Sequence, residues 1–158
     1  MAGHPSQEQL GPPTLKVDGF QLWVHGREFP ESQDHDDGNW LRVTAHCGRA
    51  GASVWAAGSI LQVMDVVRWA NECEAVGRGS RKGASLEPLE QELKVEIRAT
   101  DSLGHLEMRV EITPDHIRQE HVFIFEIDQS YIPTIVKQCR EIEKSYPIRG
   151  GTAKRGVQ

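Results

Sequence analysis

Residues Leu93–Ile112 read LKVEIRATDSLGHLEMRVEI, and this stretch decides the fold. Apolar and charged side chains alternate on both sides of Asp101–Gly104, which is the period of a strand with one buried face. With Asp101–Gly104 as the loop, one register pairs opposite charges on one face and apolar side chains on the other. Its cross-strand pairs are Arg98 with Glu107, Glu96 with Arg109, Lys94 with Glu111, Ile97 with Met108, Val95 with Val110, and Leu93 with Ile112. A slip of one residue would break both faces, so the sequence predicts an antiparallel hairpin in this register.

The N-terminal half predicts further strands of the same kind. Apolar and polar residues alternate in Phe20–His25 and again from Trp40 to His46. Asp18-Gly19 can turn a short hairpin from residues 14–17 into the first of these strands. A turn at Gly48–Gly51 would return the chain into a partner strand over Ala52–Ala57. Connections this short favour antiparallel neighbours.

Two segments have the helical period. Ile60–Val76 has a wide apolar arc, which predicts a helix covered by a sheet along most of its length. Ser130–Lys144 has an apolar stripe, and its proline lies in the first turn, where it is tolerated. The glycine-rich stretch Gly77–Ser85 is expected to be a flexible linker. His121–Ile127 is an almost unbroken apolar run, which predicts a central strand buried on both sides.

These elements together predict an α+β fold: a mainly antiparallel sheet built from hairpins, with two α-helices packed on it. A single domain is expected over residues 14–150, between a disordered leader at 1–13 and a disordered tail at 151–158. The chain has 158 residues, which is enough for one sizeable core without disulfide or metal staples. The leader has neither a basic region nor an apolar stretch, so no signal peptide is expected.

The net charge and the cysteines restrict the classes of partner and the cellular compartment. The formal net charge of −5 disfavours nucleic acid and anionic lipid as partners and suits a basic protein partner. No segment is long and apolar enough to span a membrane. The three cysteines are widely spaced and show no metal-ligand pattern, so they are expected to be buried, reduced thiols in a cytoplasmic protein.

The densest group of ligand-type side chains lies in Glu31–Gly38, ESQDHDDG, which we call the acidic loop. Taking Gly38 as the fixed glycine of a calcium loop places Gln33 and His35 where carboxylates should be, so that pattern fails. The loop therefore has two interpretations, ordinary solvated surface or a partner-binding patch. In the second, the binding residues are Glu31, Asp34, Asp36 and Asp37.

No other pattern indicates catalysis, a cofactor or a metal site. The spacing of Gly77, Gly79 and Gly83 matches no phosphate-binding loop, and the sequence contains no nucleophile elbow. Cys47 and His46 are adjacent in a predicted strand and must point to opposite faces, so they cannot act as a pair. The tryptophans are most simply core or core-edge residues, although one exposed on a sheet face would be a binding anchor.

Phrases at both ends of the chain resemble one known family. These are R-E-F-P at Arg27–Pro30 with D-G-N-W-L-R-V at Asp37–Val43, and F-I-F-E-I-D-Q-S-Y-I-P at Phe123–Pro133 with S-Y-P-I-R-G at Ser145–Gly150. The pattern is similar to that of the WapI family of immunity proteins across most of residues 20–150; the middle, from about Gly77 to Glu92, does not match.

The resemblance implies a protein that binds and neutralises the toxic C-terminal domain of a contact-dependent bacterial toxin, often a nuclease. Such nuclease domains tend to be basic, so charge complementarity would speed capture by an acidic protein. The resemblance supplies no catalytic residues. A rival interpretation is a small enzyme or ligand-binding domain with a pocket between the sheet and the helix Ile60–Val76. A structural homo-oligomer is a third, and it would show a large apolar patch on an exposed sheet face.

Overall fold

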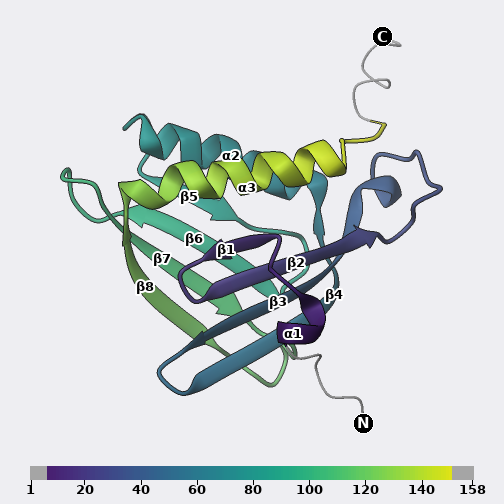
Figure 1. The fold of residues 1–158 in the computed structure, drawn as a ribbon, viewed down its shortest axis with the longest axis horizontal. Helices are drawn as coiled ribbons and strands as arrows, with labels where there is room; N and C mark the ends of the chain where they lie inside the picture. The colour runs from purple at the N-terminus through teal and green to yellow at the C-terminus, as the bar shows by residue number, and fades with distance from the viewer. Residues whose placement is uncertain (1–6, 151–158) are drawn as a thin grey trace.

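The computed structural model describes residues 7–150, which form two four-stranded antiparallel sheets with the two long helices at one end (Figure 1). The strands of the first sheet follow one another in chain order: β1 (Leu15–Val17), β2 (Phe20–Arg27), β3 (Trp40–Arg49) and β4 (Ala52–Gln62). The second sheet has the same simple order: β5 (Gly83–Leu86), β6 (Leu93–Ala99), β7 (His105–Ile112) and β8 (Val122–Asp128). The α+β class with antiparallel pairing is confirmed, although the strands divide between two sheets.

The predicted hairpin register is confirmed at every pair. Arg98 lies opposite Glu107 and Ile97 lies opposite Met108 across β6 and β7. The backbone N–H of Thr100 donates to the carbonyl of His105 at 3.0 Å, which closes the hairpin where the sequence placed its loop. The charged side chains also pair along each strand, with Arg98 Nη2 3.2 Å from Glu96 Oε1.

The turn between β1 and β2 brings the two sheets together. Asp18 and Gly19 form the two-residue loop between the paired residues Val17 and Phe20, and Asp18 has a φ of 50°. A Cβ at Gly19 would lie 2.4 Å from the carbonyl oxygen of Gly48 and 2.8 Å from the ring of Phe125. Only glycine fits here, because β3 and β8 both approach the turn.

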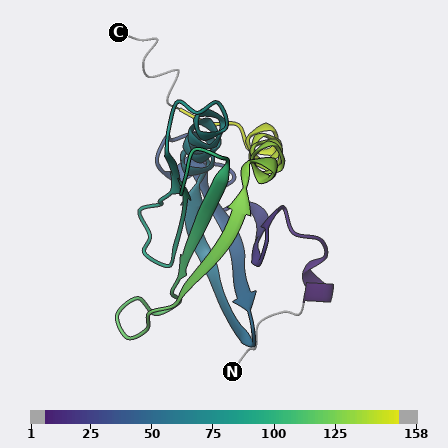
Figure 2. The same ribbon diagram turned by 90° about the vertical axis from the view of Figure 1, so that its left-hand side faces the viewer.

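The helices α2 (Val63–Gly77) and α3 (Ile132–Ser145) lie side by side across one end of the sheets (Figures 1 and 2). The prediction that the first helix begins at Ile60 is wrong, since β4 continues to Gln62. Ile60 and Leu61 suit either period, and the pairing of Leu61 with Leu41 of β3 keeps this part of the chain in the sheet. The helix then starts with a reciprocal cap, in which the backbone N–H of Gln62 donates to Asp65 Oδ2 at 2.8 Å.

The predicted linker Gly77–Ser85 contains part of a strand, so this expectation is wrong in its second half. Residues 83–86 form β5 and pair with β6, Ala84 lying opposite Ile97. Glycine and serine have low strand propensity, so this strand forms because its backbone can hydrogen-bond to the edge of β6 that would otherwise be unpaired. The backbone N–H of Ser85 also donates to Glu72 Oε1 of α2 at 2.9 Å.

The expectation that His121–Ile127 is a central strand is also wrong. β8 lies at the edge of the second sheet and pairs only with β7. Phe125 and Ile127 face the core, whereas the side chain of Ile124 is 51% exposed on the other face. An apolar run shows that a strand is hydrophobic on both faces, but it does not show that both are covered.

One hydrophobic cluster connects both sheets with α2 and α3. Its largest fully buried side chains include Trp69 of α2, Phe20 of β2 and Phe125 of β8. The three cysteines are free and buried in this cluster, as the sequence predicts. Of the predicted leader, residues 7–10 form one helical turn, α1 (Gln7–Leu10), while residues 1–6 and the predicted tail 151–158 lie outside the described residues.

Candidate partner-binding surface

The acidic loop lies between β2 and β3, and a buried arginine at the end of β2 anchors its base. Arg27 is 8% exposed, and its guanidinium donates to the carbonyls of Gly38 (2.6 Å) and Pro147 (2.5 Å). Burial, and secondarily the nearby charge of Arg149, lowers the pKa of Arg27 from its ordinary value. A buried guanidinium needs acceptors, and here it takes them from the loop and from the segment that follows α3.

Asn39 makes the second connection between the same two segments. It is fully buried, and its Oδ1 accepts the backbone N–H of Arg149 at 2.9 Å. Its Nδ2 donates to the carbonyls of His35 (2.7 Å) and Arg149 (3.0 Å). The side-chain amide thereby satisfies loop and C-terminal backbone groups that would otherwise be buried without partners.

Arg149 closes the connection from the C-terminal side. Its Nη1 donates to the carbonyls of Pro30 (2.6 Å) and Ser32 (2.8 Å). These contacts join two parts of the chain that carry the sequence resemblance. One is the N-terminal part, Arg27–Pro30 with Asp37–Val43, and the other is Ser145–Gly150. Their separation of more than 100 residues in the chain hides this contact from local sequence analysis.

The four predicted binding residues lie together on this loop, but their side chains differ in role. Asp34 Oδ1 accepts the backbone N–H groups of Asp36 (2.8 Å) and Asp37 (3.1 Å), which shapes the turn before the short 3-10 helix Asp37–Asn39. All four residues are exposed, Asp34 included. A Cβ at Gly38 would lie 2.6 Å from the carbonyl oxygen of Ser32, so the loop also requires its glycine.

A second surface, which the sequence did not single out as a site, lies on the outer face of the first sheet. The rings of Trp23 and Trp55 stack with centroids 5.8 Å apart, and the ring of His46 lies 4.3 Å from that of Trp55. Trp23 is buried and its indole N–H donates to the carbonyl of Gly11 at 3.0 Å, whereas Trp55 is partly exposed. Burial lowers the pKa of His46. The alternation in β2, β3 and β4 could have predicted this shared face.

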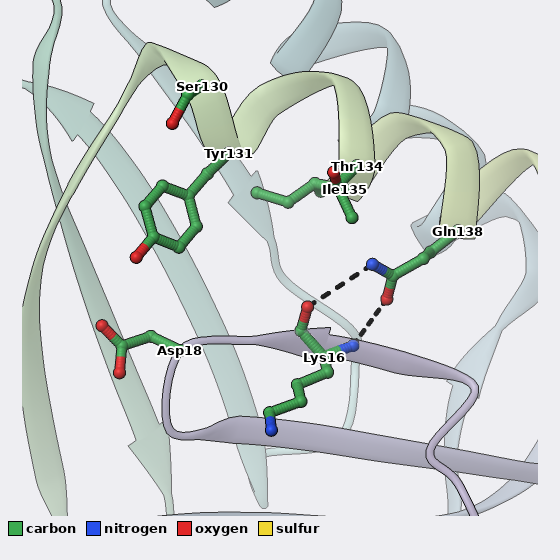
Figure 3. A pocket seen from close by; sticks show the side chains of 7 residues that line it. All are labelled: Lys16, Asp18, Ser130, Tyr131, Thr134, Ile135 and Gln138. Carbon is green, nitrogen blue, oxygen red and sulfur yellow. Dashed lines mark hydrogen bonds between the residues drawn. The ribbon is translucent and has the colours of Figure 1, made fainter.

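The rival interpretation required a pocket beneath the first long helix. The sheet-facing side of α2 is instead filled by buried side chains, Val66, Trp69, Ala70 and Cys73 among them. A hollow of about 560 Å³ lies between β1 and α3, where Lys16, Asp18, Tyr131 and Gln138 line it (Figure 3). Among residues 7–150, no three His, Cys, Asp or Glu side chains converge as metal ligands would.

The chain matches the model of the Immunity protein WapI-like family over residues 14–147. It therefore belongs to that family, as the resemblance of its two ends indicates. Membership implies a non-enzymatic role in immunity to a toxin, through binding of a cognate toxin partner. No curated protein and no solved structure gives a significant match. No helix in the described residues is long and apolar enough to cross a bilayer.

Proposed function

We propose that this chain neutralises the toxic C-terminal domain of a contact-dependent bacterial toxin in the cytoplasm of the producing cell. It does so by stoichiometric binding that occludes the active site or the substrate surface of a basic domain, such as a nuclease. The observation that carries the proposal is the acidic loop, because its exposed carboxylates sit on a backbone fixed by Arg27, Asn39 and Arg149. A pre-ordered loop loses little conformational entropy on binding.

Charge supports the same partner. The net charge of −5 and the exposed carboxylates would attract a basic domain, and the carboxylates can imitate the phosphates that a nuclease binds. Loops held by a rigid scaffold commonly carry binding residues. Because exposed charges at the rim of an interface act mainly on association rates, kinetics are a sharper test than affinity alone.

The function is tested with the C-terminal domain encoded by the gene directly upstream, the candidate toxin domain. Expression of that domain alone should stop growth, and co-expression of this chain should restore it. The purified pair should form a complex of defined stoichiometry in which the activity of the toxin domain is lost. Continued toxicity despite full expression of the folded chain would contradict the proposal.

The role of the loop is tested by Glu31→Gln, Asp36→Asn and Asp37→Asn together. Asp34 is kept because its carboxylate shapes the turn. We expect association with the candidate toxin domain to slow by about three- to ten-fold at low salt, with the difference shrinking at high salt. The matched control changes three exposed glutamates elsewhere, Glu8, Glu90 and Glu141, to glutamine and brings the net charge to the same −2, since −5 + 3 = −2. Equal rates for both variants would leave the loop as ordinary surface.

A further inference from the structure

Each sheet has two edges, and α3 covers one edge of the first sheet. β1 has only three residues there. The backbone N–H of Lys16 donates to Gln138 Oε1 of α3 at 2.5 Å, and Gln138 Nε2 donates back to the carbonyl of Lys16 at 3.5 Å (Figure 3). The glutamine side chain thus takes the place of a neighbouring strand and blocks strand addition at this edge.

Two further edges carry other forms of protection. β5 has four residues, and Glu72 of α2 accepts the backbone N–H of Ser85. β4 is long and pairs with β3 in unbroken register over residues 52–59; its register shifts at Ile60, and Gly58 has a φ of 143°, so only its C-terminal end is irregular. Short strands, covering side chains and bulges are the usual means by which proteins protect sheet edges.

β8 differs from the other three edges in the large apolar side chains that it exposes, Val122 and Ile124. Its seven residues pair with β7 in an unbroken register, and the strand runs along the side of the molecule that faces the viewer in Figure 2. The backbone N–H of Ile112 donates to His121 at 3.2 Å, and that of Gln129 donates to Gly104 at 3.0 Å. Hydrogen-bonded pairs alternate in an antiparallel ladder, so the N–H and C=O groups of Val122, Ile124 and Glu126 point away from β7. Within residues 7–150, no other element bonds to these six groups.

The side chains of the same three residues indicate what would pair there. Val122 is 38% exposed and Ile124 is 51% exposed, both on the outer face of the second sheet. Arg98, Glu107 and Glu126 form one row across that face, so the row ends in two adjacent like charges. A neighbouring strand would relieve that repulsion with a basic residue beside Glu126 and would cover Ile124 with an apolar one.

We infer that the free edge of β8 takes an extended segment of the cognate toxin domain as an added strand, with an apolar residue beside Ile124 and a lysine or arginine beside Glu126. This rests on the proposed function, and it adds a second contact to the acidic loop. A second copy of the chain fits less well, because β8 (VFIFEID) contains two acidic residues and no basic one. Each copy also carries a net charge of −5.

The test uses the full chain and the candidate toxin domain. Ile124→Pro removes an outward N–H and leaves the ladder with β7 intact. Ile124→Ala removes the same side chain but keeps the N–H, so it is the matched control. We expect the proline variant to bind about ten-fold or more weakly than the alanine variant, with thermal unfolding checking that both are folded. The decisive measurement needs no variant: in the wild-type complex, amide exchange at Val122, Ile124 and Glu126 should slow by about ten-fold or more.

The other outcomes are distinguishable. A complex in which those three amides exchange as fast as in the free chain would overturn the edge pairing and leave the proposed function standing. Absence of any complex would overturn the proposed function and this inference with it. The chain alone could instead show protection of these amides from exchange that rises with its concentration, together with a dimer mass. That result would assign the edge to a second copy and overturn pairing with the toxin domain.

Discussion

Single side chains hold the acidic loop against the C-terminal segment, and Asn39 is the most fully buried of them. Three of its side-chain hydrogen bonds join backbone groups of His35 and Arg149 across 110 residues of chain. Unlike a surface carboxylate, a buried amide has no water to replace a lost partner. The geometry of the loop therefore depends in part on a residue that itself has no exposed surface.

Asn39→Ala should lower the free energy of unfolding by about 2–4 kcal/mol, because it leaves several buried backbone groups without partners. Urea denaturation measures this loss. Gln33→Ala, an exposed position in the same loop, is the control and should change stability by less than about 0.5 kcal/mol. A loss of similar size in both variants would show that the Asn39 bonds do not hold the loop.

His105 and Asp101 form an exposed pair at the tip of the β6–β7 hairpin, with His105 Nδ1 2.6 Å from Asp101 Oδ2. The hydrogen bond raises the pKa of His105 and lowers the pKa of Asp101. The contribution of His105 is fully present below its unfolded pKa of about 6.5 and is lost as pH rises through the folded value. That of Asp101 is present above its unfolded pKa of about 3.9 and is lost as pH falls through the folded value.

Asp101→Asn should therefore lower the melting temperature more at about pH 5.5 than at about pH 9, since only the lower pH lies in the window where both partners are charged. The asparagine keeps an oxygen for the backbone N–H of Leu103, so the turn itself is preserved. His105→Gln is the control, because Asp101→Asn made in that background should show no such pH dependence. NMR titration of His105 provides an independent check on the direction of its pKa.

At the scale of elements, a charged cluster joins the two long helices. Arg140 of α3 donates to Glu74 and, at 2.7 Å, to Asn71 Oδ1 of α2. The side-by-side packing of α2 and α3 (Figure 1) brings Arg140 to this contact. The side chains of Arg140 and Glu74 are both more than one-third exposed, so solvent screens their attraction.

A double-mutant cycle of Arg140→Ala with Glu74→Ala should give a coupling energy of only about 0.5 kcal/mol, and less at high salt. The control cycle combines Arg140→Ala with Glu141→Ala. Glu141 is the exposed sequence neighbour of Arg140, and its coupling energy with Arg140 should be close to zero. Chemical denaturation of the four variants in each cycle provides the values. A coupling that is equal in the two cycles would contradict a specific contact between the helices.

At the scale of the whole molecule, the reactivity of the three free thiols measures how well the hydrophobic core excludes solvent. Cys47, Cys73 and Cys139 are each at most 1% exposed. Burial raises the pKa of Cys47 and of Cys139 to about 12, and it raises the pKa of Cys73 as well. Both the lack of access and the scarcity of thiolate at neutral pH protect these side chains from reagents.

The native protein should therefore show almost no reaction with a thiol reagent such as DTNB at about pH 8, and three thiols should react in denaturant. Ser102→Cys, in the exposed hairpin loop, is the positive control and should add one fast-reacting thiol. Fast labelling of any of the three native cysteines would indicate that the core opens locally near that residue.

Local sequence determined the elements whose evidence lies within a few residues. The β6–β7 register followed from charges and apolar side chains that oppose each other across one loop, and the burial of the three cysteines followed from their wide spacing without a metal-ligand pattern. Asp65 shows what periodicity does not report: aspartates are mostly exposed, yet Asp65 is only 6% exposed because it caps the start of α2. Burial raises its pKa.

The positions of the loop carboxylates could likewise be read from the sequence, but what fixes them could not. Only the tertiary structure placed Arg149 against Pro30 and Ser32, made β5 a strand and put β8 at an edge. The physical reason is the same in each case. Periodicity reports which faces of a segment are apolar. Whether a strand lies at a sheet edge, or a loop is held in place, depends instead on which distant segment hydrogen-bonds to the backbone groups of that strand or loop.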